Sequence, residues 1–160
     1  MKRVTTHFLR LALIVIALGV LAFCIFALPE MWRGGSAEFP VASKAVFLIM
    51  IGLYATAIPF YIALWHLFKL LRYIDRNKAF SELSVKALRN IKICTIIIAS
   101  LYVAGVPLLF PIAESDDAPG LILIGGAVAC IPVAIAVFTI VLHRLLKNAI
   151  EIKSENDLTV

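Results

Sequence analysis

Residues 67–92, LFKLLRYIDRNKAFSELSVKALRNIK, decide how this chain is arranged, because they separate the second and third of four long apolar runs. The stretch is the largest concentration of positive charge in the chain, carried by Lys69, Arg72, Arg76, Lys78, Lys86, Arg89 and Lys92. Its only acidic residues are Asp75 and Glu82. Helical patterning on both sides predicts a basic helical hairpin at a membrane surface.

The turn of this hairpin is predicted at Asn77, which tolerates a left-handed backbone better than its neighbours do. Ser81 is expected to cap the helix that follows, with Glu82 lying favourably in the first turn. Phe80 and Val85 have the spacing of a hydrophobic staple. The packed face of this helix is expected to carry Leu83, Ala87, Leu88 and Ile91.

The composition excludes an ordinary soluble protein, since 62% of the 160 residues are hydrophobic and the mean hydropathy is +1.02. Runs without charged residues cover 11–29, 45–68, 93–113 and 118–142, each near or above the ~20 residues that cross a bilayer. We therefore predict an all-α four-transmembrane-helix bundle, a single membrane domain of residues 1–160. The predicted boundaries are spans at about 8–29, 45–71, 91–112 and 119–147, a cytosolic loop at 72–90 and a cytosolic tail at 148–160.

The distribution of Lys and Arg predicts the orientation in the membrane. All of these residues lie at the two ends of the chain or in the central loop, except Arg33 and Lys44. The positive-inside rule therefore places both termini and the central loop in the cytosol. The first apolar run is expected to remain as an uncleaved span, because it is long for a signal peptide and Phe23 occupies a position where cleavage requires a small residue.

The spans contain prolines and small residues that predict how the helices pack. Pro59 is expected to kink the second span. Ser100 and Ala104 form a small-xxx-small pair in the third span. In the fourth span the small residues Gly125, Gly126, Ala129 and Ala134 are expected to mark helix contacts, with Gly126 and Ala129 facing another helix. The outer loop, Pro29–Lys44, is expected to contain at most a short interfacial segment.

No catalytic or metal site is predicted. No Asp, Glu, Lys or Arg lies in a span core, which argues against proton- or ion-coupled transport. His7, His66 and His143 all fall near the inner boundary, yet no carboxylate or cysteine accompanies them at ligand spacing, so we expect no metal and no cofactor. No nucleophile–base pair is recognisable, so an enzyme is not expected. The cysteines are interpreted as small apolar residues: Cys24, Cys94 and Cys130.

The cytosolic face is the predicted docking surface. Its candidate residues are Arg72, Arg76, Lys78, Lys86 and Arg89 in the loop and Asp157, Leu158, Thr159 and Val160 in the tail. They would bind an acidic partner or anionic lipid headgroups. Two plainer interpretations stay open: the loop serves only as a positive-inside connector, and the tail is a frayed end rather than a segment captured by strand addition.

Four spans together with two specific segments carry a resemblance, over nearly the whole chain, to the bacterial domain-of-unknown-function family 2975. The specific segments are the central loop with Asp75, Asn77, Phe80-Ser81 and Val85-x-x-Leu88-x-x-Ile91, and the terminal residues 155–160, Glu-Asn-Asp-Leu-Thr-Val. Members often have Gly where this chain has Asn77, and both residue types tolerate a positive φ. The resemblance implies an integral protein of the bacterial inner membrane with no assigned activity. It also implies a partner, because genes of the family often neighbour that of a small helix-turn-helix transcription regulator.

The predicted function is that of a multi-pass membrane protein that acts as a regulatory or scaffold partner of a cytosolic protein. Direct nucleic-acid binding is not expected, since the basic residues flank spans instead of forming a folded basic domain. The alternative is a small transporter or channel for an uncharged or lipid-like solute. Association with the bilayer is required by the spans, and a homo-oligomer is left open.

Overall fold

The computed structural model describes the backbone of residues 2–159 and the side chains of residues 4–159. Throughout this part of the chain the regular structure is helical, with no strand. The elements in order are α1 (Lys2–Ala22), the π-helical turn η1 (Phe23–Ala27), α2 (Leu28–Glu38), α3 (Ser43–Asp75), α4 (Glu82–Gly105), the 3-10 turn η2 (Val106–Leu109), α5 (Phe110–Ser115) and α6 (Gly120–Leu158).

Four helical stretches are long and apolar enough to cross a membrane, which confirms the all-α, four-span prediction. They cover Val4–Glu38, Ser43–Asp75, Glu82–Ser115 and Gly120–Leu158. The first and third are each built from several consecutive helical elements.

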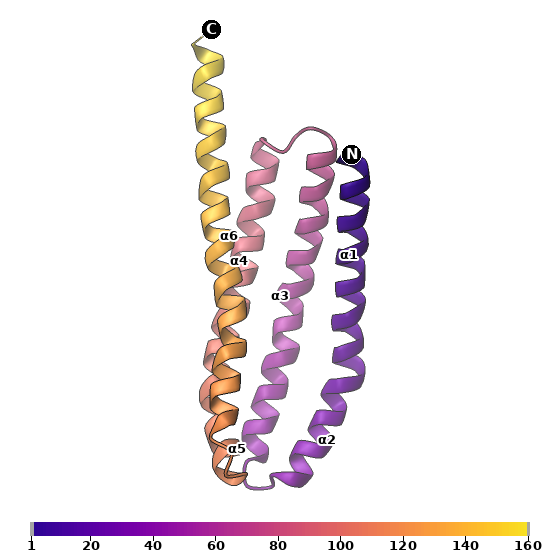
Figure 1. Cartoon of the computed structure of the whole chain (residues 1–160), viewed down its shortest axis with the longest axis vertical. Coiled ribbons are helices and arrows are strands. Elements are labelled where there is room, and N and C mark those ends of the chain that lie inside the picture. Colours follow the sequence, from indigo (N-terminus) through magenta and orange to yellow (C-terminus); the bar gives the residue numbers. More distant parts are fainter. Residues whose placement is uncertain (1, 160) are drawn as a thin grey trace.

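The long helices form a row in the order α1, α3, α4 and α6 (Figure 1). The central helix α4 packs against both α3 and α6, whereas α1 packs along α3. Both ends of the chain and the α3–α4 turn lie at one end of the row, and α2 and α5 lie at the other (Figure 1). We call these the inner and outer ends, after the predicted orientation.

The α3–α4 turn is held by its own hydrogen bonds, as the sequence predicts. Asn77 has a φ of 55°, and the amide of Lys78 donates to the carbonyl of Tyr73 at 2.8 Å. The Ser81 side chain caps α4 by accepting from the amide of Ser84 at 3.4 Å. Both serine hydroxyls donate to the carbonyl of Lys78, at 2.7 Å from Ser81 and 2.9 Å from Ser84. The turn is therefore an ordered element.

The packed face of α4 differs from the prediction at its first turn. Ala87, Leu88 and Ile91 are buried as expected, but Leu83 is 51% exposed and Ser84 is fully buried in its place. Burial of Ser84 is tolerated because its hydroxyl is hydrogen-bonded. Phe80 is 58% exposed, which gives no support to the predicted staple.

The best-packed apolar cluster lies at the outer end. It consists of Leu28, Ala42, Ala45, Val46, Met50 and Ile112. The helix continues to Glu38, so most of the predicted outer loop is α2, and only a short turn precedes α3. Gly35 allows the close approach of α2 to α3, since a Cβ on it would lie 3.0 Å from Val46 Cγ1. The rings of Trp32 and Phe47 add an edge contact with centroids 5.5 Å apart.

The prolines act differently at different depths. Pro59 and Pro132 lie inside α3 and α6, which continue through them, as membrane helices commonly do. Pro107, in contrast, lies in the 3-10 turn that ends α4 and starts the short helix α5.

The predicted small-residue contacts are shifted by a few positions. Gly125 is the glycine in close contact, because a Cβ on it would clash with Leu109 Cδ1. A Cβ on Gly126 would meet nothing within 4 Å, because this residue lines a groove that faces Val106 and Pro107, while Ala129 is buried as expected. Ser100 and Ala104 are exposed, and the small buried residues of α4 in the span are Cys94, Thr95 and Ala99.

Candidate functional site

The five candidate loop cations gather at the inner end of the α3–α4 hairpin. Arg72 lies in the last turn of α3, Arg76 caps that helix, Lys78 lies in the turn, and Lys86 and Arg89 lie in the first turns of α4. All five are exposed, and none forms an ion pair with another residue between 4 and 159. The hairpin therefore presents uncompensated positive charge on an ordered turn.

Helical spacing places these cations away from the packed interior. Arg72 and Arg76 share a face of α3 with Lys69, whose ammonium lies 5.6 Å from the centre of the Trp65 ring. Lys86 and Arg89 are three residues apart on α4, off the face that buries Ala87, Leu88 and Ile91. This set of basic side chains is accompanied by an aromatic ring typical of a membrane–water boundary.

Asp75 does not neutralise the turn, because it is paired with the first helix. Arg10 Nη2 lies 2.6 Å from Asp75 Oδ2, and the two side chains are 32% and 27% exposed. This pair could not be predicted from the sequence, since 65 residues separate its members. Within the central stretch only Glu82 is left as an acidic residue without an ion-pair partner among residues 4–159.

The predicted tail residues lie apart from the turn. Asp157 and Leu158 belong to the last turn of α6, and Thr159 follows it. Val160 lies outside the described residues. Figure 1 shows that the end of α6 extends past the α3–α4 turn, so the loop cations and the tail are not brought together. The tail is helical to Leu158, which does not fit the extended conformation that strand addition requires.

A polar cluster surrounds α4 near its inner end. Asn90 Nδ2 lies 3.3 Å from His66 Nε2, which links α4 to α3. On the α6 side, His143 interacts electrostatically with the nearby cations Lys92, Lys147 and Arg89. The buried nitrogens His66 Nδ1 and His143 Nε2 find no hydrogen-bond partner among the described residues.

The histidines do not form a metal centre. His7 is exposed on α1, and no group of three or more metal-ligating side chains occurs in the part of the chain described. Sequence reasoning missed the role of Asn90 as the neighbour of His66. A polar amide about two turns into the third long helix, at the depth of a histidine on the preceding helix, is the signal that would have indicated it.

Helix α1 is attached to α3 by polar contacts spaced seven residues apart along α1. Tyr61 donates its hydroxyl to the carbonyl of Ala17 at 2.8 Å, and Tyr54 donates to the carbonyl of Cys24 at 2.9 Å. The Arg10–Asp75 pair continues the series toward the inner end. Cys24 belongs to the π-helical turn η1, a type of distortion often found at functional positions.

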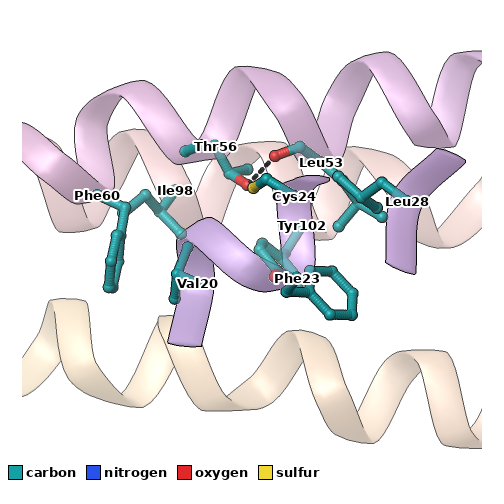
Figure 2. A pocket seen from close by; sticks show the side chains of 10 residues that line it. Val20, Phe23, Cys24, Leu28, Leu53, Thr56, Phe60, Ile98 and Tyr102 are labelled. Atoms are coloured by element: carbon teal, nitrogen blue, oxygen red, sulfur yellow. Dashed lines mark hydrogen bonds between the residues drawn. The ribbon is translucent and has the colours of Figure 1, made fainter. Parts of the chain in front are cut away.

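A cavity of about 200 Å³ lies at this seam, between α1, α3 and α4. Figure 2 shows side chains from the three helices converging on it. It is lined by apolar groups, and Thr56 donates its hydroxyl to the carbonyl of Leu53 at 2.7 Å (Figure 2). The cavity therefore offers apolar contacts and no free hydroxyl donor from this threonine.

Two larger apolar grooves lie between α3, α4 and α6. The outer one has a volume of about 440 Å³ and the inner one about 340 Å³. Thr95 and Thr139 line the inner groove, yet each donates to a carbonyl of its own helix, at 2.9 and 2.7 Å. The grooves suit aliphatic groups and contain no acid–base pair for catalysis.

Comparisons with known proteins agree with a membrane protein of this architecture. A relative from Bacillus subtilis (strain 168), "Uncharacterized membrane protein YoaS", is 52% identical over 160 residues, which is 100% of both chains. The family model "Protein of unknown function (DUF2975)" matches residues 30–160. Neither description names an enzymatic activity. No solved structure matches the chain. This four-span membrane protein belongs to the DUF2975 family of unknown function.

Proposed function

We propose that this protein is a scaffold or regulatory partner in the bacterial cytoplasmic membrane, and that its inner end binds an acidic surface of a cytosolic protein. The observation that carries the proposal is the set of five exposed cations on the capped α3–α4 turn, none of which forms an ion pair with a residue between 4 and 159. An ordered turn presents these charges in a fixed arrangement, which lowers the entropy lost on binding.

The proposed partner is a small helix-turn-helix transcription regulator, as the family resemblance implies. The positive-inside rule places the docking residues in the cytosol, where such a regulator would be. The protein would act by retention at the membrane and not by catalysis, since the site consists of charged groups without a nucleophile–base pair. Contacts of this kind weaken as salt increases.

A crosslinked pull-down from native membranes tests the proposal. Lys78, Lys86 and Arg89 would be changed together to Gln, which removes three docking charges and keeps enough inner cations for topology. The expected result is normal insertion with at least a tenfold loss of the captured cytosolic protein. Arg33→Gln with Lys44→Gln, at the outer end, is the matched control and should capture as much as the unaltered protein.

Equal capture by the triple variant and the unaltered protein would refute docking through the turn. The loop would then act as a topology anchor alone. The same strains can carry a reporter fused to the promoter of the protein's own operon. Retention of a regulator predicts that the triple variant alters reporter expression while the outer control does not.

Carriage of a lipid-like solute is the second candidate, favoured by the apolar grooves between α3, α4 and α6. An aliphatic chain would gain apolar contact there without leaving a polar group unpaired. Gly52→Leu and Ala55→Leu, at residues that line the outer groove, would fill it. If these variants lose transport of a lipid-like solute but still capture the cytosolic protein, carriage is favoured over docking.

A further inference from the structure

The last helix is longer than a membrane span requires. Helix α6 has 39 residues, whereas ~20 suffice to cross the bilayer core. Its final turns pass the α3–α4 turn and have no neighbouring helix at that level (Figure 1). It is also the outermost helix of the row, since α4 is the long helix that it packs against. One side of α6 is therefore free along its length.

That free side carries a heptad pattern as the helix leaves the membrane. The spacing alternates between four and three residues through Leu145, Ala149, Ile152, Asn156 and Thr159. Leu145 and Ile152 are each 59% exposed. The pattern assigns Ala149 and Asn156 to the a positions of a coiled coil and the others to the d positions.

The opposite side of the same segment is polar. Lys147 Nζ and Glu151 Oε1 lie 4.0 Å apart across one turn, and the side chain of Ser154 follows on the same face. Lys153 and Glu155 lie on either side of the apolar stripe, at the e and g positions where coiled coils usually carry charge. The segment is amphipathic in the way that a helix pairing with another helix is.

This stripe differs from the apolar surface inside the bilayer. Lipid tails cover an apolar side chain in the membrane, but water does not, so exposed Ile152, which lies beyond the predicted end of the span, favours association there, while Leu145 extends the same stripe into the membrane. A single helix of a few turns is also marginally stable in water without packing. Packing against another helix would therefore stabilise the projecting end of α6.

We propose that the partner is the α6 helix of a second copy of this chain, in a parallel two-stranded coiled coil. Two copies in one membrane have the same orientation, so a twofold axis along the membrane normal places identical α6 residues at identical depth. The heptads are then in register without further adjustment. Asn156 at an a position is the residue type that selects a parallel dimer in register.

This dimer is independent of the proposed docking function. The coiled coil uses Leu145, Ala149, Ile152 and Asn156, whereas docking uses the cations of the α3–α4 turn. Dimerisation would present two such turns on one side of the membrane, so a dimeric cytosolic regulator would meet two sites. Loss of one property need not remove the other.

Cysteine crosslinking in native membranes tests the dimer. Cys24, Cys94 and Cys130 are first changed to Ala, and the insertion of this parent is verified. Ile152→Cys is then introduced at a d position and Ser154→Cys on the opposite face as the matched control. Mild oxidation should convert most of the Ile152→Cys protein to a species of twice the 17.6 kDa chain mass. The Ser154→Cys protein should stay monomeric.

Co-purification of two differently tagged copies is the second measurement. Ile152→Glu places a charge in the seam and should reduce co-purification at least tenfold, while Ser154→Glu should not. The proposal is overturned if Ile152→Cys stays monomeric, if Ser154→Cys crosslinks equally well, or if Ile152→Cys crosslinks to a chain of another mass. The last result would assign the stripe to a different protein with an amphipathic helix.

Discussion

Arg10 Nη2 lies 2.6 Å from Asp75 Oδ2, so the start of the first span is tied to the end of the second at the inner end of the protein. This pair lies on the side of α1 that packs along α3. It also removes Asp75 from the charge balance of the turn. The pair therefore has two effects: it attaches α1 to α3, and it changes the net charge of the proposed docking face.

Asp75→Asn is expected to destabilise the protein in detergent by about 1 kcal/mol, as for a partly exposed ion pair at a helix contact. Arg10→Gln should have a similar effect. The double variant should be no less stable than either single variant, since the energy belongs to the pair. Thermal unfolding of the four proteins measures this coupling, and strictly additive losses would contradict it.

Tyr54→Phe and Tyr61→Phe are expected to loosen α1 from α3. Each removes a hydroxyl that donates to a backbone carbonyl of α1, a contact worth about 1 kcal/mol. Tyr102→Phe is the control, because no hydrogen bond from its hydroxyl to another described residue is found. Limited proteolysis of α1 in detergent should accelerate for the first two variants. Equal rates for all three would mean that these hydrogen bonds do not hold the helix.

Gly125→Leu is expected to destabilise the protein more than Gly126→Leu. A side chain on Gly125 meets Leu109, which must move, and overpacking of this kind typically costs about 1–3 kcal/mol. A side chain on Gly126 begins in open space. The midpoint of thermal unfolding in detergent compares the two variants, and a larger loss for Gly126→Leu would place the helix contact on the other face.

Asn77→Gly is expected to leave stability unchanged, whereas Asn77→Val should lower it. The φ of 55° at this residue suits Asn and Gly, and a β-branched residue in the left-handed region costs about 1–2 kcal/mol. Equilibrium unfolding in a denaturing detergent would reveal the difference. Equal stability of the two variants would show that the turn changes its backbone conformation freely.

The spans, the turn at Asn77 and the cap at Ser81 were predictable because each depends on local sequence. Run length decides whether a helix can cross a bilayer, and the turn and cap depend on the backbone preferences of a few neighbouring residues. The exposure of the cations at the α3–α4 turn was predictable for the same reason, since charged residues leave the apolar spans.

The rotation and pairing of the helices could not be predicted in this way. In a membrane protein the lipid-facing side is as apolar as the packed side, so hydrophobic periodicity does not mark the buried face. Leu83 was therefore predicted to be packed, whereas the buried residue is Ser84. The Arg10–Asp75 pair joins different helices without any sequence signal for which residues meet, and the Asn90–His66 pair was indicated only by the similar depth of its two polar side chains.

The proposed function depends most directly on which side of the membrane the inner end faces, because docking of a cytosolic protein requires the α3–α4 turn to be in the cytosol. Single cysteines would be placed in the cysteine-free parent at Ala37, Phe80, Ser115 and Ser154. Ala37 and Phe80 are exposed apolar residues near turns. An impermeant maleimide added to intact cells should label Ala37→Cys and Ser115→Cys. Phe80→Cys and Ser154→Cys should react only after the membrane is opened. Labelling of Phe80→Cys in intact cells would contradict the proposed cytosolic docking face.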